Sequence, residues 1–174
     1  ATLYPWGDVF SEQRVNACDR NCPMRWADDS FNDGTTFAAA VGTFGGGVSW
    51  AGAQDMAGNV WEWTADWYDP NYYARSPVDN PAGPSGSVDE DGKSVRGGAW
   101  SSTDQGVRST TRVSVGAWRG HFDVGIRCAY DVALSQSGAA QSTLISNTDP
   151  PPGTDIRFVA VSTGPFVRGS TADD

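Results

Sequence analysis

Residues 55–68 read Asp55-Met56-Ala57-Gly58-Asn59-Val60-Trp61-Glu62-Trp63-Thr64-Ala65-Asp66-Trp67-Tyr68 and crowd three tryptophans, a tyrosine and three carboxylates around one glycine. A buried tryptophan needs both a packed ring and a partner for its indole N–H. The stretch therefore predicts a dense aromatic core with acidic groups beside it, and a short strand over residues 61–68. Acidic groups held against such a core suggest a bound cation.

Length and charge limit what this chain can be. Its 174 residues suffice for one main domain with a sizeable core and a tail. Because 12 lysines and arginines face 21 aspartates and glutamates, the net charge of -9 argues against nucleic acid or an anionic membrane surface as a partner. No stretch approaches the roughly 20 apolar residues of a membrane span.

Turn signals outnumber helix signals throughout the chain. Residues 1–50 carry closely spaced glycines, prolines and an Asn-Asp-Gly turn, which predict loops. The expected fold class is α+β, mostly β and rich in loops. Three further strands are expected at residues 94–100, 107–115 and 124–130.

Composition divides the chain into three parts. Residues 1–134 form the expected core domain. Residues 135–155 have the serine-, threonine- and proline-rich composition of a linker. Residues 156–174 follow as a tail that opens with Ile156-Arg157-Phe158-Val159-Ala160-Val161, a run that alternates well enough to pair with a sheet edge.

The three cysteines are unevenly placed. Cys18 and Cys22 lie close together in Cys-Asp-Arg-Asn-Cys-Pro, and an acidic, lysine-poor composition typical of secreted proteins favours a small disulfide loop between them. Two cysteines with one distant histidine are too few for zinc. Cys128 has apolar neighbours and is expected to be a buried structural thiol.

Five sequence blocks occur in an order typical of one known family. They are Tyr4-Pro5-Trp6-Gly7-Asp8, the stretch at residues 55–68, Asn80-Pro81-Ala82-Gly83-Pro84, Val95-Arg96-Gly97-Gly98-Ala99-Trp100 and Gly125-Ile126-Arg127-Cys128-Ala129. In these blocks the chain resembles the sulfatase-modifying-factor family, which includes the formylglycine-generating enzymes. The resemblance spans residues 4–130 and implies a variant of the C-type-lectin fold.

The resemblance also implies which residues catalysis would require. Formylglycine-generating enzymes use a copper-binding cysteine pair just after the Arg-Gly-Gly block, but residues 101–107 contain no cysteine here, and serine is neither a soft ligand nor redox-active. Sulfoxide synthases of the superfamily hold iron with several histidines, whereas this chain has only His121. Neither copper nor iron is expected, and no catalytic residue is assigned.

The leading interpretation is a structural or binding module that is extracellular or on the cell surface and is not an enzyme. It corresponds to the group of relatives without a recognised catalytic centre. Two alternatives stay open. One is an oxidase-like enzyme of the formylglycine-generating type with altered catalytic groups or with groups from another chain, and the other is a lectin-like domain that binds a glycan or another ligand.

Relatives of this kind commonly bind two calcium ions, and the resemblance transfers both ligand sets. The first comprises the carboxylates of Asp55 and Glu62 with the carbonyls of Gly58 and Val60; the second comprises Asn16, the carbonyl of Ala17, Asp33 and the carbonyl of Thr35. Mixed carboxylate and carbonyl oxygens suit calcium. Alternatively, Asp55 and Glu62 only cap a turn, and Asn32-Asp33-Gly34 is only a turn.

A ligand-facing surface is the remaining candidate site. Ser102 and Asp104 occupy the loop that is active or ligand-facing in the family, and Trp118, Arg119 and His121 lie on a loop expected beside it. Together they would form a polar, aromatic recognition surface. A plain solvated loop is an equally good interpretation.

The ends of the chain depart from the family pattern. A complete family domain opens with a Gly-x-Phe-x-x-Gly-Ser strand and two helices, whereas here the C-terminal residues 158–171 resemble that opening strand. The fold is therefore expected to be incomplete or permuted in its N-terminal part. A circular permutation, a fragment of a tandem array or a strand-exchanging subunit would each explain the order. In the last case residues 156–174 would pair with another copy by strand addition and build a fibre.

Overall fold

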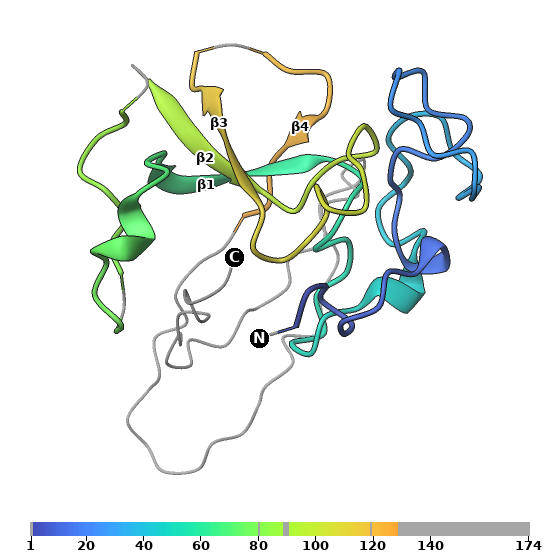
Figure 1. Ribbon diagram of the computed structural model, residues 1–174, viewed down its shortest axis with the longest axis horizontal. Helices are drawn as coiled ribbons and strands as arrows, with labels where there is room; N and C mark the ends of the chain where they lie inside the picture. Colours follow the sequence, from blue (N-terminus) through green and yellow to red (C-terminus); the bar gives the residue numbers. More distant parts are fainter. Residues whose placement is uncertain (1, 80, 89–90, 119, 129–174) are drawn as a thin grey trace, which may run out of the picture.

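The structure is a computed structural model that describes residues 2–79, 81–88, 91–118 and 120–128. Its centre is a four-stranded sheet in the order β3-β2-β1-β4 (Figure 1). The strands are β1 (Trp61–Trp67), β2 (Gly92–Arg96), β3 (Arg112–Gly116) and β4 (Val124–Gly125). The described residues form three single-turn 3-10 helices and no α-helix: η1 (Glu12–Arg14), η2 (Gly45–Gly47) and η3 (Tyr72–Ala74). The mostly β, loop-rich fold is thus confirmed.

Strand β1 lies between two strands that run in opposite directions. It pairs antiparallel with β2, so that Trp63 lies opposite Val95, and parallel with β4, so that Trp61 lies opposite Val124. Trp61 and Trp63 have the same parity along the strand and pack with Val95 in one apolar cluster. The short strand expected over residues 61–68 is thus confirmed, one residue shorter at its end.

The other expected strands are shorter than the sequence indicated. Strand β2 ends at Arg96, because Gly97 and Gly98 adopt φ of 90° and 76°, which turns the chain away from the sheet. Residues 107–110 form turns and a bend rather than strand, and β3 begins only at Arg112. Val107 was expected in a strand, but it lies in a loop. Its side chain is fully buried there and packs in the core with Tyr4 and Val15. Strand β4 ends at Gly125.

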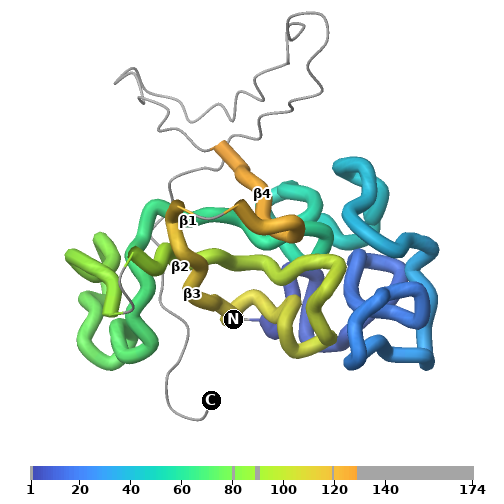
Figure 2. The backbone as a smooth tube through the Cα atoms, turned by 90° about the horizontal axis from the view of Figure 1, so that it is seen from above, coloured from blue at the N-terminus to red at the C-terminus, as the bar shows by residue number. Residues whose placement is uncertain are grey.

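Long loops occupy both ends of the sheet (Figure 2). The loops of residues 2–57 form the larger end, and those of residues 68–79 and 81–88 form the other. Buried amides hold the larger end together. The Asn59 side chain bonds the backbone of Ala39 in both directions and accepts a bond from Asn16 Nδ2 (3.2 Å), while the Asn59 carbonyl accepts from the Trp100 N–H (2.9 Å).

Cys128 is exposed, contrary to the expectation of a buried thiol. The reason is its place in the alternation after β4. Arg127 points inward to Glu62, so Ile126 and Cys128 face outward, and Ile126 is 78% exposed. Apolar neighbours in sequence therefore did not indicate burial.

Two expectations fall outside the described part of the chain. The linker at residues 135–155 and the strand-like tail at residues 156–174 both lie beyond residue 128, so both remain predictions. Among the described residues, no helix has the length and apolar character needed to cross a membrane.

Candidate functional site

The loop of residues 101–107, where the family's cysteine pair is expected, is a tightly bonded turn. Ser102 is 9% exposed, and its Oγ accepts a hydrogen bond from the Ala99 N–H (3.0 Å). The Ser102 N–H donates to the Ala99 carbonyl (2.9 Å). At the other end of the loop, Val107 is fully buried in the apolar core. Both ends of the loop therefore have structural roles.

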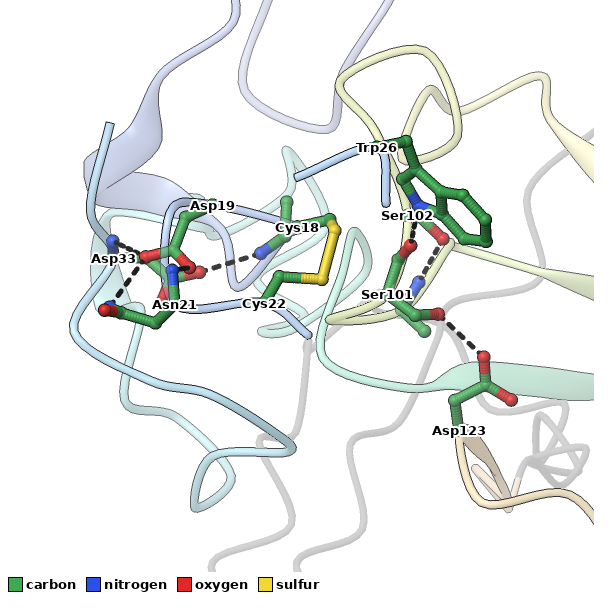
Figure 3. The surroundings of a disulfide bond; sticks show 11 residues. Cys18, Asp19, Asn21, Cys22, Trp26, Asp33, Ser101, Ser102 and Asp123 are labelled. Atoms are coloured by element: carbon green, nitrogen blue, oxygen red, sulfur yellow. Dashed lines mark hydrogen bonds between the residues drawn. A yellow bond between two sulfur atoms is a disulfide. The ribbon is translucent and has the colours of Figure 1, made fainter. Parts of the chain in front are cut away.

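A disulfide joins Cys18 to Cys22 beside this loop, as the sequence predicted (Figure 3). The Cys18 N–H donates to the Ser102 carbonyl (2.8 Å), which ties the disulfide loop to the turn. The two cysteines are 1% and 7% exposed and pack in a cluster with Trp100 and Met24. The bond is thus shielded from solvent.

Replacing Cys18 and Cys22 together with alanine should lower the free energy of unfolding by about 2 kcal/mol, because the crosslink closes a short loop and constrains the unfolded chain. Urea denaturation would measure the loss. The matched control is Cys128→Ala, which removes an exposed thiol and should change stability by less than about 0.5 kcal/mol. A double variant as stable as the wild type would show that the disulfide does not stabilise the loop.

The expected ligand-facing residues lie in different surroundings. Ser102 is buried in the turn, whereas Asp104 is exposed and lines a hollow of about 270 Å³ together with Trp26, Asp28 and Asp29. Trp118 is 84% exposed and His121 is exposed. Arg119 lies outside the described residues.

The loop that carries Trp118 and His121 does reach the turn at residues 101–107. Phe122 packs against Trp100 with 5.7 Å between ring centroids, and Ser101 Oγ donates to Asp123 Oδ2 (2.7 Å). The structure thus brings the two loops together, through two residues that the sequence had not singled out.

The first expected calcium site lies in the turn that precedes β1. Asp55 and Gly58 both have positive φ there, 53° and 72°. Asp55 Oδ2 accepts a hydrogen bond from the Gly42 N–H (2.6 Å). Val60 ends the turn and is half-buried, one residue before the strand.

Glu62, the fourth residue of this site, is paired with Arg127. Arg127 Nε lies 3.0 Å from Oε1 and 2.8 Å from Oε2, and Nη2 lies 2.6 Å from Oε1. Nη2 also donates to the carbonyls of Gln54 (3.0 Å) and Asp55 (3.2 Å). The bonds with Glu62 raise the pKa of the Arg127 guanidinium, so it stays charged. Arg127 therefore brings a positive charge to the turn expected to hold calcium.

The second expected calcium site is also internally bonded. Asp33 Oδ2 accepts from the Ala17 N–H (2.9 Å), and Oδ1 accepts from both the N–H and the hydroxyl of Thr35 (2.8 Å each). Asn16 is buried and donates through Nδ2 to the Phe37 carbonyl (3.0 Å). Burial raises the pKa of Asp33 above its ordinary value, against the lowering effect of Thr35. Asp33 and Thr35 thus form an Asx-type turn that is bonded to Ala17, whereas the Asn16 amide donates away from Asp33, to Phe37 and Asn59.

These contacts indicate how well each site fits calcium, which takes six to eight oxygen ligands. At the first site, calcium would compete with Arg127 for Glu62. At the second, an ion would have to share Asp33 with three hydrogen-bond donors. In the described part of the chain, no three His, Cys, Asp or Glu side chains group as metal ligands. Both calcium sites stay predictions, and Arg127 is a competitor for the first.

A mostly β domain with a four-stranded sheet and long loops at both ends defines the class of fold. "Treponema denticola variable protein 1" shares it, with a TM-score of 0.50 and 21% identity over 66% of this chain and 35% of that one. At this identity the likeness concerns the fold alone.

Sequence comparison is more specific. The family described as "Sulfatase-modifying factor enzyme 1-like domain" matches residues 1–132. The chain therefore belongs to this family, as the five sequence blocks predicted.

Relatives whose names state different activities each match most of the chain. A "Formylglycine-generating enzyme" from Streptomyces coelicolor is 37% identical over 144 residues, which cover 79% of this chain and 43% of that protein. An "Inactive C-alpha-formylglycine-generating enzyme 2" from Bos taurus is 30% identical over 132 residues, covering 73% and 37%. The chain thus spans less than half the length of either relative.

Proposed function

We propose that this chain is a non-catalytic binding and structural module of the sulfatase-modifying-factor family, which works outside the cell and associates with other copies through residues 156–174. The observation that carries the first part is the loop of residues 101–107. Ser102 is bonded in a turn there, Val107 is buried, and the loop has no thiol for copper. The family includes a relative named as inactive, which is consistent with this proposal.

The disulfide supports the proposed compartment. Disulfides persist in oxidising surroundings and are rare in reducing ones, and Cys18 is paired with Cys22 here. The proposed self-association rests on the sequence of the tail, which alternates apolar residues over 156–161.

Copper binding tests the non-catalytic part. The oxidised chain should not withdraw Cu(I) from a chromogenic chelator, because in the described residues Cys128 is the free thiol and one thiolate makes a weak site. Cys128→Ser is the control that removes this thiol. Stoichiometric Cu(I) binding that persists in Cys128→Ser would overturn the proposal.

Native mass spectrometry tests the self-association, with and without a calcium chelator. We expect a ladder at multiples of the chain mass. Phe158→Asp combined with Phe166→Asp should reduce it to the monomer, because both charges oppose burial of the tail. The matched control, Leu144→Asp, places one charge in residues 135–155 and should keep the ladder. A wild-type chain that is monomeric in both conditions would contradict self-association.

One observation favours a second function. The Cys18 N–H bonds the Ser102 carbonyl (2.8 Å), so a cysteine pair lies against the loop in which the family's thiols are expected. Reduced, this pair could supply the altered thiol groups of an oxidase-like enzyme. That function requires Cu(I) binding that appears on reduction and disappears in Cys18→Ser.

A further inference from the structure

Two surface hollows are lined by residues of the same two loops, which one hydrogen bond joins. Trp26 Nε1 donates to the Ser101 carbonyl (2.8 Å) and joins the loop of residues 22–29 to that of residues 100–104 (Figure 3). One hollow, of about 460 Å³, is lined by Met24 from the first loop and Trp100 from the second. The other, of about 270 Å³, is lined by Asp28 from the first loop and Asp104 from the second. The hollows are therefore neighbours.

The larger hollow is apolar. Trp100 is 3% exposed and has Phe37 packed edge-on against it, with 5.0 Å between ring centroids, and Phe122 tilted at 5.7 Å. Phe37 and Phe122 are themselves 57% and 74% exposed. Two phenylalanines that border an apolar hollow and remain this exposed favour an apolar occupant, since covering them removes apolar surface from water.

The smaller hollow is acidic. Asp28, Asp29 and Asp104 line it, and none of the described residues that line either hollow is basic. Hydrogen bonds from Ser30 lower the pKa of Asp28, so this carboxylate is ionised at neutral pH. An occupant that spans both hollows would therefore combine an apolar side chain with a cation.

The tail of this chain has that chemistry. In a protein of net charge -9, residues 156–170 contain Arg157 and Arg168 and no acidic residue. Phe166 and Arg168 are two positions apart, so in an extended segment their side chains would lie on the same face about 7 Å from each other. Residues 129–165 could span more than about 100 Å when extended, which is enough to reach the hollows of the same chain or of a neighbour.

We infer that the two hollows are the docking site for residues 164–170, with Phe166 in the apolar hollow against Trp100 and Arg168 at the acidic hollow beside Asp104. This inference deepens the proposed self-association by naming the surface that receives the tail. The charge of Arg168, opposite to that of the acidic hollow, sets the direction of the segment, and burial of the Phe166 ring stabilises the docked segment.

Photo-crosslinking in the full chain tests the docking. Phe166 is replaced with p-benzoylphenylalanine, the protein is irradiated, and the crosslinked residues are mapped by mass spectrometry. We expect crosslinks to Met24, Phe37, Trp100 or Phe122. The control places the same probe at Leu144, which should not crosslink to these residues.

A charge reversal adds a readout of the acidic hollow. Arg168→Glu should lower the crosslink yield about two- to fivefold, the range for an exposed ion pair, and Asp104→Arg in the same chain should restore it. Absence of crosslinks to the hollow, or crosslinks only elsewhere, would overturn the docking even if the chain forms oligomers. Crosslinks to the hollow within a monomer would support the docking and contradict the proposed self-association, so the two failures are distinguishable.

Discussion

Gly58→Ala is expected to lower the free energy of unfolding by about 3–4 kcal/mol, because two costs add at this position. Gly58 has φ of 72°, a conformation that side-chain-bearing residues rarely adopt. A Cβ there would also meet the Asn16 carbonyl oxygen and lie 2.5 Å from Val15 Cγ2. To relieve the clash, residues 15–16 would have to move away from Gly58. That movement would break the hydrogen bond from the Asn59 N–H to the Asn16 carbonyl (2.9 Å).

Gly52→Ala is the matched control for this prediction. Gly52 has a similar φ of 81°, but a Cβ there meets no atom within 4 Å. It should therefore show the backbone strain alone, about 1–2 kcal/mol. Chemical denaturation of both variants would separate strain from close approach. Equal losses in the two variants would show that the crossing of residues 15–16 over Gly58 is looser than the structure indicates.

The part of the fold that local patterns specify was predictable from the sequence. The aromatic stretch at residues 55–68 predicted a strand over residues 61–68, which is β1, and the close pair Cys18 and Cys22 predicted the disulfide. Both depend on neighbours in sequence. The length of β2 and β3 was less predictable, since Gly97 and Gly98 end the first and Val107 owes its burial to a loop rather than to a strand.

The candidate site depends on contacts between distant residues, which composition and spacing do not encode. The sequence named Glu62 and Arg127 separately, but their pairing across 65 positions follows from the parallel alignment of β1 with β4. Asn59 likewise lay in the quoted stretch without a role. Its one available signal was the Gly-Asn pair, since asparagine tolerates the positive φ of 65° that places its amide against Ala39.

Arg127→Met should have the second large effect, a loss of about 2–3 kcal/mol in calcium-free buffer, because it leaves the Glu62 carboxylate unpaired. The pair is partly buried, with side-chain exposures of 30% for Arg127 and 20% for Glu62. The guanidinium also bonds the carbonyls of Gln54 and Asp55, so the turn before β1 loses its hydrogen bonds to the segment that follows β4. Methionine keeps most of the apolar stem.

Calcium makes this prediction specific. Without the guanidinium, the Glu62 carboxylate and the Asp55 carbonyl lose their partner and can bind a cation, so calcium should restore stability to Arg127→Met, by about 2.7 kcal/mol at a hundredfold excess over its Kd. The wild type should gain less at the first site, since Arg127 competes there. Arg112→Met is the control. Arg112 bonds the carbonyls of Asp69 and Pro70, so the stability lost in this variant should not be restored by calcium. Thermal unfolding with and without a chelator measures all three proteins. An equal calcium response in wild type and Arg127→Met would show that the guanidinium and the ion occupy the turn together, and that Arg127 does not take the place of calcium.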